Sequence, residues 1–224
     1  MKNRKSLRSA GSILFTGILF FMCFNLALFN AVSAQNYTPV KDIAGFKKLY
    51  AAKSTAMNTL KSDFVQEKSV SMLTNKLISN GTFIFKKTNK LRMEYAKPYP
   101  YIFVMNEDQI IIKNDQKKSS VSVNSNKMFK MISQLTVDCV TGNILNSKDF
   151  DVEISENAKV YFLVLKPNQK MIKSLFTEID LLVAKSDFTV DRIDLKETSG
   201  DSTTLIFSNK KINTPVSDEA FNVN

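Results

Sequence analysis

Apolar and polar residues alternate along much of this chain, which is the period-two pattern of β-strands. The alternation is clear in residues 77–86 and 91–95, and short apolar runs follow at 102–105 and 110–112. Asn, Asp, Glu and Lys separate these segments, as they do in turns. Short strands repeated roughly every 8–12 residues are typical of an antiparallel sandwich or barrel.

Two segments change to a helical period. After Asp42, which is a suitable N-cap, apolar residues recur every three or four positions as far as Leu60. In residues 125–135 a broad apolar face is formed by Met128, Phe129, Met131, Ile132 and Leu135. The next segment, 137–145, is apolar but contains Gly142, which predicts a broken helix or a mobile loop.

The strand pattern resumes at residues 150–154 and continues through 176–183, 192–197 and 203–208. Residues 160–165 are apolar on both faces, and residues 167–175 can hold one helical turn. The chain therefore predicts about ten strands and two or three helical pieces.

A sheet of this size seldom stays flat, and strands that are apolar on both sides indicate that both faces are covered or dry. The helices are too few and too short to cover both faces. The sheet therefore either closes as a packed barrel or forms a half-barrel with an apolar lumen under a helical lid. The predicted fold class is mainly β: one strongly curved antiparallel sheet, or incomplete β-barrel, with an N-terminal helix and a helical lid.

The N-terminus has the three parts of a secretory signal. Four basic residues lie in the first eight positions, residues 13–28 are almost wholly apolar, and residues 32–34 (Val-Ser-Ala) resemble a cleavage site. A retained membrane anchor is the rival interpretation, but the apolar run is shorter than the ~20 residues that a spanning helix needs. We expect a cleaved signal peptide at residues 1–34 and a single domain at residues 35–224.

The residue content excludes most catalytic and metal chemistry. The chain has no histidine, and Cys139 is the one cysteine after residue 34. It therefore lacks the commonest general base and metal ligand, and we expect no enzyme activity, metal or cofactor. The acid pairs Asp149/Asp151 and Asp191/Asp194 could mimic a glycosidase site, but solvated surface charges explain them better.

The net charge of +10, of which the signal carries four, suits anionic lipid head groups or an acidic partner. A soluble lysine-rich surface explains it equally well. Scattered lysines on an exported protein make nucleic acid a poor candidate partner.

Several segments, taken in order, resemble one known family. They are LKSDFVQE at 60–67, the run GTFIFKKTNKLRMEY at 81–95 followed by Pro98, YFLVLKP at 161–167 and DSTT at 201–204. The order is completed by Ile193, Phe207, Asn209 and residues 218–221. This set is similar to outer-membrane lipoprotein carrier proteins of the LolA type and covers nearly all of the mature chain.

The resemblance implies an incomplete antiparallel barrel whose mouth is closed by helices. It also implies a periplasmic protein, expected to be a monomer, that hides lipid in its lumen and uses no cofactor. The implied partners are acylated lipoproteins or other lipids, an inner-membrane lipoprotein-releasing transporter, and an outer-membrane acceptor.

The family often has an Arg-Pro pair in the turn after the second strand of the second segment, where the Arg latches the lid through backbone carbonyls. Here the pair is Lys87-Thr88. Lys can donate to a carbonyl but lacks the planar fork of Arg, so the lid either opens more easily or is held elsewhere. Lys87 is therefore predicted at the cavity rim near the lid. Arg92 is the alternative, although an outward strand residue paired with Glu94 or with a neighbouring strand explains it better.

An apolar lumen suits this cargo, because burying one CH₂ group gains about 0.8 kcal/mol. The predicted acyl cavity is lined by Phe64, Phe83, Phe85, Leu91, Met93, Ile102, Val104, Ile110, Ile112, Phe162, Val164, Leu181 and Phe207. The predicted lid residues are Met128, Phe129, Met131, Ile132 and Lys87. Any one of them could be ordinary core, so the hypothesis depends on their collective excess.

Two other functions remain open on the same scaffold. One is a carrier of a different lipid or a glycolipid. The other is a periplasmic lipid-sensing or interaction module that shuttles nothing.

Overall fold

The computed structural model describes residues 36–87, 89–107, 109–122 and 127–223. The predicted signal peptide at residues 1–34 lies outside this range and stays a prediction. The description below concerns the compact unit Tyr37–Asn224.

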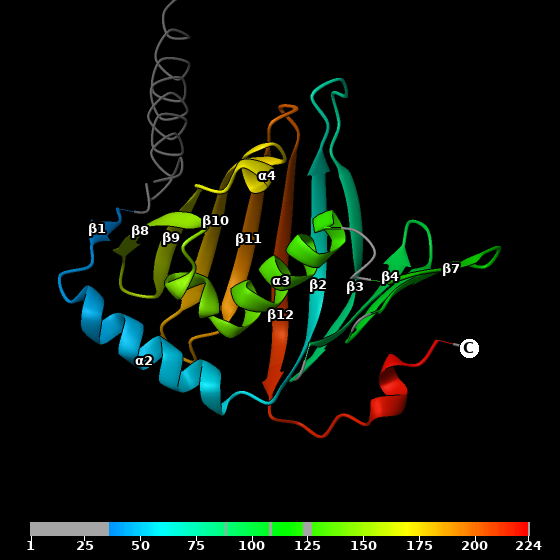
Figure 1. The fold of residues 1–224 in the computed structure, drawn as a ribbon, viewed down its shortest axis with the longest axis horizontal. Coiled ribbons are helices and arrows are strands. Elements are labelled where there is room, and N and C mark those ends of the chain that lie inside the picture. Colours follow the sequence, from blue (N-terminus) through cyan, green and yellow to red (C-terminus); the bar gives the residue numbers. More distant parts are fainter. Residues whose placement is uncertain (1–35, 88, 108, 123–126, 224) are drawn as a thin grey trace, which may run out of the picture. The chain divides into compact units, whose positions relative to one another are not determined.

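The described strands form one open antiparallel sheet (Figure 1). Its strand order is β1-β8-β9-β10-β11-β12-β2-β3-β4-β5-β6-β7, so that β1 and β7 are its two edges. The strands are β1 (Thr38–Pro39), β2 (Thr59–Ser69), β3 (Leu77–Lys86), β4 (Lys90–Lys97), β5 (Tyr101–Asn106), β6 (Gln109–Lys113), β7 (Lys118–Ser122), β8 (Phe150–Glu156), β9 (Val160–Pro167), β10 (Phe176–Ala184), β11 (Val190–Glu197) and β12 (Ser202–Ile212).

This architecture confirms the predicted fold class and excludes the closed barrel. Among the described residues there are twelve strands, against about ten expected from the pattern. The shortest, β1, pairs only two residues with β8, which is too short to show an alternation in the sequence.

The described helical segments are α2 (Ile43–Ala56), α3 (Lys127–Thr141), η3 (Asn143–Asn146), α4 (Lys170–Lys173) and η4 (Asp218–Phe221). Asp42 is the N-cap of α2, as predicted, since its Oδ1 accepts the Gly45 N–H at 2.8 Å. Figure 1 shows α3 crossing one face of the sheet over β11, β12 and β2, and α2 running along the end of that part of the sheet. We name this helix-bearing side the covered face, and the opposite side the outer face.

The segment after residue 137 proved to be helix up to Thr141. Gly142 then ends α3 with a φ of 74°. A Cβ at this position would come within 2.8 Å of Ser54 Oγ and 2.9 Å of the Tyr50 ring. Glycine is therefore needed here for both its backbone angle and the close approach of α2.

Two apolar clusters fill the covered face. The first joins Phe46 and Tyr50 of α2, and Leu135 and Cys139 of α3, to strands β8–β11. The second joins Val137 of α3 to strands β2–β6. Because Leu205 and Phe207 of β12 pack against both clusters, the covered face is continuous, and α3 lies over the junction.

A third cluster lies on the outer face, where the C-terminal segment packs across β3–β6. Its centre is Phe221, which is fully buried against Val104. Polar contacts hold the segment in place: Arg92 Nη1 donates to the Ala220 carbonyl at 3.2 Å, and Asp218 accepts from Lys86 at 3.0 Å.

Candidate functional site

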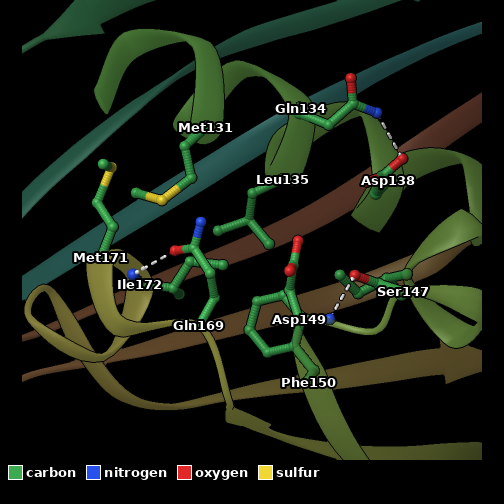
Figure 2. A pocket seen from close by; sticks show the side chains of 11 residues that line it. Met131, Gln134, Leu135, Asp138, Ser147, Asp149, Phe150, Gln169, Met171 and Ile172 are labelled. Atoms are coloured by element: carbon green, nitrogen blue, oxygen red, sulfur yellow. Dashed lines mark hydrogen bonds between the residues drawn. The ribbon is translucent and has the colours of Figure 1, made fainter. Parts of the chain in front are cut away.

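A cavity of about 320 Å³ lies between α3, α4 and the start of β8 (Figure 2). Helix α3 supplies one wall of the cavity, and the segments around β8 and α4 supply the other. The lining residues are Met131, Gln134, Leu135, Asp138, Ile144, Ser147, Asp149, Phe150, Gln169, Met171 and Ile172.

The deep part of this cavity is apolar. Leu135, Ile144, Phe150 and Ile172 are all buried and belong to the first cluster. Figure 2 shows Met131 of α3 at the same end of the cavity as Met171 of α4. Because Met is flexible and polarizable, Met131 and Met171 can adapt to apolar ligands of different shape.

Polar groups around the cavity are mostly bound to one another. Gln134 Nε2 donates to Asp138 Oδ1 at 2.9 Å, and Gln169 Oε1 accepts the Ile172 N–H at 3.2 Å. Burial raises the pKa of Asp138, and the nearby Asp149 carboxylate adds to the rise. The cavity therefore offers an apolar floor and, at its rim, an acid that keeps its proton to a higher pH than a free aspartic acid does.

Nine of the residues predicted to bind acyl chains lie on the covered face of the sheet. They are Phe64, Phe83, Phe85, Leu91, Met93, Ile110, Ile112, Leu181 and Phe207. Most of them form the second cluster or pack against it, and none lines the 320 Å³ cavity. Contact with a ligand remains a prediction for all nine.

Ile102 and Val104 were assigned to the wrong face. Strand β5 pairs Phe103 with Met93 and Met105 with Leu91, which places Phe103 and Met105 on the covered face. The alternating residues Ile102 and Val104 therefore point outward, where they pack with the C-terminal segment. The run from Ile102 to Met105 is apolar on both faces because both faces are covered.

Phe162 and Val164 need the same correction. Leu163 pairs with Leu181 on the covered face, so the flanking residues Phe162 and Val164 lie on the outer face. There the Phe162 ring stacks on Tyr37, with ring centroids 5.0 Å apart.

Of the predicted lid residues, Met131 lines the cavity. The side chains of Met128, Phe129 and Ile132 lie outside the described part of the chain, although their backbone is within α3. The predicted helix is thus present and continues beyond the predicted end at residue 135, whereas its role as a lid stays a prediction.

Lys87 reaches α2 rather than α3, because its ammonium group donates to the Thr55 carbonyl in the last turn of α2. Lys87 also lines a second cavity, of about 290 Å³, together with Val137 and Thr141 of α3. The role of Lys87 at a rim remains a prediction, and Thr88 lies outside the described residues. Arg92 is bound to Glu94 at 2.8 Å, which confirms the interpretation of Arg92 as an outward strand residue.

Sequence reasoning missed the wall of the cavity opposite α3. Ile144, Phe150, Met171 and Ile172 come from loops and short helical turns, where no long periodic pattern marks a buried side. The one available signal was the helical turn expected within residues 167–175, which is α4.

The family model described as outer membrane lipoprotein carrier protein LolA matches residues 55–224. The chain therefore belongs to the outer membrane lipoprotein carrier protein family, which confirms the resemblance read from its segments. No curated protein matches the chain at a significant level.

Several solved structures resemble the chain at low identity. An uncharacterized conserved protein of Thermus thermophilus has 12% identity and a TM-score of 0.50, over 80% of this chain and 91% of that protein. MucB has 11% identity and a TM-score of 0.50, over 84% of this chain and 65% of MucB. Lipoprotein LppX of Mycobacterium tuberculosis has 13% identity and a TM-score of 0.42, over 80% of this chain and 99% of LppX. At these identities the first two likenesses concern the fold alone.

Among the described residues, no helix combines the length and apolarity needed to cross a membrane. The same part of the chain holds no group of three or more acidic or cysteine side chains arranged for a metal ion.

Proposed function

We propose that this protein binds the acyl chains of lipoproteins on the covered face of its sheet, under α3, and carries them across the periplasm from the inner to the outer membrane. The observation that carries the proposal is the 320 Å³ cavity under α3, whose floor is continuous with the apolar core. Membership of the carrier family supports lipoproteins as the cargo.

The energetics require a protected apolar site. At about 0.8 kcal/mol per CH₂ group, a ~16-carbon chain loses roughly 12 kcal/mol of stabilisation on entering water. The cavity, at about 320 Å³, is at the lower end of the ~300–1,000 Å³ range of ligand pockets. We therefore infer that α3 moves away from the sheet when a whole acyl chain binds.

The position of α3 favours such an opening. Helix α3 is held by Leu135 and Cys139 in the first cluster and by Val137 in the second. Lifting it would uncover the junction of the two clusters at Leu205 and Phe207. The predicted acyl-binding residues of the covered face would then form one surface with the cavity floor. Cargo would enter from an inner-membrane lipoprotein-releasing transporter and leave to an outer-membrane acceptor.

In this proposal Lys87 connects the sheet to α2. Its bond to the Thr55 carbonyl joins the β3–β4 turn to the end of α2, beside the C-terminal half of α3. The bond would help to hold α2 against the sheet while α3 moves.

Depletion of the protein in its native cell tests the proposal. We expect lipoproteins to accumulate in the inner membrane, measured by separating the two membranes by density and immunoblotting each. An unchanged distribution would reject the shuttle and favour a sensing module. Mass spectrometry of lipid extracted from the purified protein identifies the cargo, and a glycolipid in place of acylated protein would reject lipoproteins.

A further inference from the structure

The hairpin that joins β2 to β3 carries an unusual concentration of exposed apolar side chains. Figure 1 shows it projecting at the end of the sheet opposite the β3–β4 turn. Met72 is 91% exposed, and Leu73, Leu77 and Ile78 are each more than half exposed. We name residues 70–78 the hairpin tip.

Tyr99 adds to the same end of the sheet. Strand β3 pairs Asn80 with Lys97, so the β4–β5 loop that follows Lys97 lies beside the base of the hairpin tip. Tyr99, in that loop, is 80% exposed. Of the large apolar side chains that are exposed in the described residues, five of eleven gather here.

Hydrogen bonds and an ion pair hold the hairpin tip in place. Asp201 of the adjacent β11–β12 hairpin accepts the Ser71 N–H at 2.9 Å, and Lys68 forms an ion pair with Glu197. Within the tip, the Leu73 N–H donates to the Val70 carbonyl at 2.8 Å. The fold therefore holds Met72 and Leu73 in water rather than leaving them on a loose loop.

The apolar side chains also point in several directions. Leu77 pairs with Lys68 on the covered-face side of the hairpin, whereas the next residue, Ile78, is on the outer-face side. Met72 and Leu73 occupy the end between them. A groove on a partner protein would contact one side of the hairpin, whereas a lipid layer surrounds an inserted hairpin on all sides. Apolar side chains on both sides therefore favour lipid as the partner.

The charge of the chain favours anionic lipid. Residues 35–224 carry a net charge of +6, which is the +10 of the whole chain less the four basic residues of the predicted signal. At the hairpin tip, Lys68 and Lys76 are paired with Glu197 and Glu67, and the exposed Lys97 precedes the loop that carries Tyr99. Exposed apolar side chains on a protein of net positive charge are a usual means of binding at an anionic membrane surface.

We propose that the hairpin tip, with Tyr99, docks the protein on a lipid surface by inserting Met72 and Leu73 among anionic lipids. This contact is separate from the cargo site, because its residues lie outside the 320 Å³ cavity and α3. It would hold the carrier briefly at a membrane with the covered face still available for cargo.

Vesicle flotation tests the proposal, using the chain without residues 1–34, since the core lies entirely within Tyr37–Asn224. The probes are protein-free vesicles of phosphatidylcholine, with and without phosphatidylglycerol in equal parts. We expect binding to the anionic vesicles that weakens with added salt. The double variant Met72→Ser, Leu73→Ser should bind about tenfold or more weakly, because two apolar side chains no longer insert.

The matched control is the double variant Ile43→Ser, Leu49→Ser on α2, where the two side chains are 48% and 45% exposed. It removes two exposed apolar side chains elsewhere and should bind like the parent. The chain has no tryptophan, so Met72→Trp supplies a single reporter whose emission should shift to the blue on anionic vesicles.

Three outcomes would overturn the proposal. The first is that the parent protein does not float with protein-free vesicles of either composition. The second is equal binding by the hairpin-tip variant, with its fold verified by circular dichroism. The third is binding only to native membranes that contain proteins, which would assign the tip to a protein partner instead.

Discussion

At the scale of single residues, Asp138 puts a partly buried carboxyl group at the rim of the cavity. Burial raises its pKa, with hydrogen bonds from Gln134 and Asn143 acting against the rise. The folded protein therefore keeps this proton to a higher pH than the unfolded chain does. Its contribution to stability is then greatest below the unfolded pKa and is lost as the pH rises through the folded pKa.

We accordingly expect Asp138→Asn to raise the melting temperature at neutral pH by up to a few degrees, and to have little effect near about pH 3, where both states are protonated. Calorimetry at the two pH values measures the difference. Asp115→Asn, in an exposed turn, serves as the control and should change neither value. An equal gain at both pH values from Asp138→Asn would contradict this account.

A comparison of Gly142 with Gly200 distinguishes two reasons why a position requires glycine: a positive φ angle and a close contact that leaves no room for a Cβ. Both have positive φ, 74° and 86°, but a Cβ at Gly142 would meet Ser54 and Tyr50, whereas at Gly200 the nearest atom is 3.8 Å away. We expect Gly200→Ala to cost about 1–2 kcal/mol for its backbone angle alone. Gly142→Ala should cost clearly more, measured by urea unfolding. Equal losses would show that the contact with α2 is unimportant.

At the scale of elements, the sequence predicted the type and order of the strands better than the direction of their side chains. Clear alternation in β3 and β4 placed Phe83 and Leu91 correctly on the covered face. In β5 and β9 it failed, because Val104 is buried under Phe221 and Phe162 is stacked on Tyr37. A strand that is covered on both faces has no polar side to reveal its orientation.

The candidate site shows the same limit. The α3 wall was predicted from helical periodicity, and Met131 was included. The facing wall was not, because Phe150 and Ile172 are brought to α3 only by the tertiary fold. The Lys87 contact with Thr55 on α2 was likewise beyond a sequence pattern, since it joins residues 32 positions apart.

A charge at Ile112 tests ligand binding on the covered face without unfolding the protein. Ile112 lies on β6, opposite Phe103 of β5, and is 47% exposed, so a charged side chain there stays hydrated when no ligand is bound. We expect Ile112→Glu to weaken acyl binding by about tenfold or more, because bound lipid would bury an unpaired charge. Displacement of a fluorescent fatty acid measures the affinity.

The control for this test is Ile206→Glu, at a position of the outer face that is 37% exposed. It introduces the same charge on the other side of the sheet and should leave affinity within about twofold, a difference well below 1 kcal/mol. Unchanged binding by Ile112→Glu would remove the β4–β7 end of the sheet from the proposed site.

At the scale of the whole molecule, the sheet remains open yet protects its edges. Edge strand β1 has two residues and edge strand β7 has five, with Lys118 at its start. Short edges, one with a proline and the other with a lysine, discourage pairing with a second copy of the chain. This is consistent with the monomer expected from the sequence.

The proposed movement of α3 implies that the protein recognises ligands by their apolar area rather than by the shape of their head groups. We expect affinity for single-chain amphiphiles to rise about fourfold for each added CH₂ group, until the chain outgrows the covered face. Competition by a series of lysophospholipids of increasing chain length measures the slope. A flat series would contradict a hydrocarbon-binding lumen.

The burial of Cys139 in α3 has a practical consequence for a protein predicted to leave the cytoplasm. The thiol is 3% exposed, and burial raises its pKa to about 12, so it resists oxidation and unwanted cross-linking while α3 rests on the sheet. Because Cys139 is the one cysteine after residue 34, the rate at which its thiol is labelled reports the proposed opening of α3. Iodoacetamide should label it slowly in the resting protein and faster whenever cargo or a partner lifts the helix.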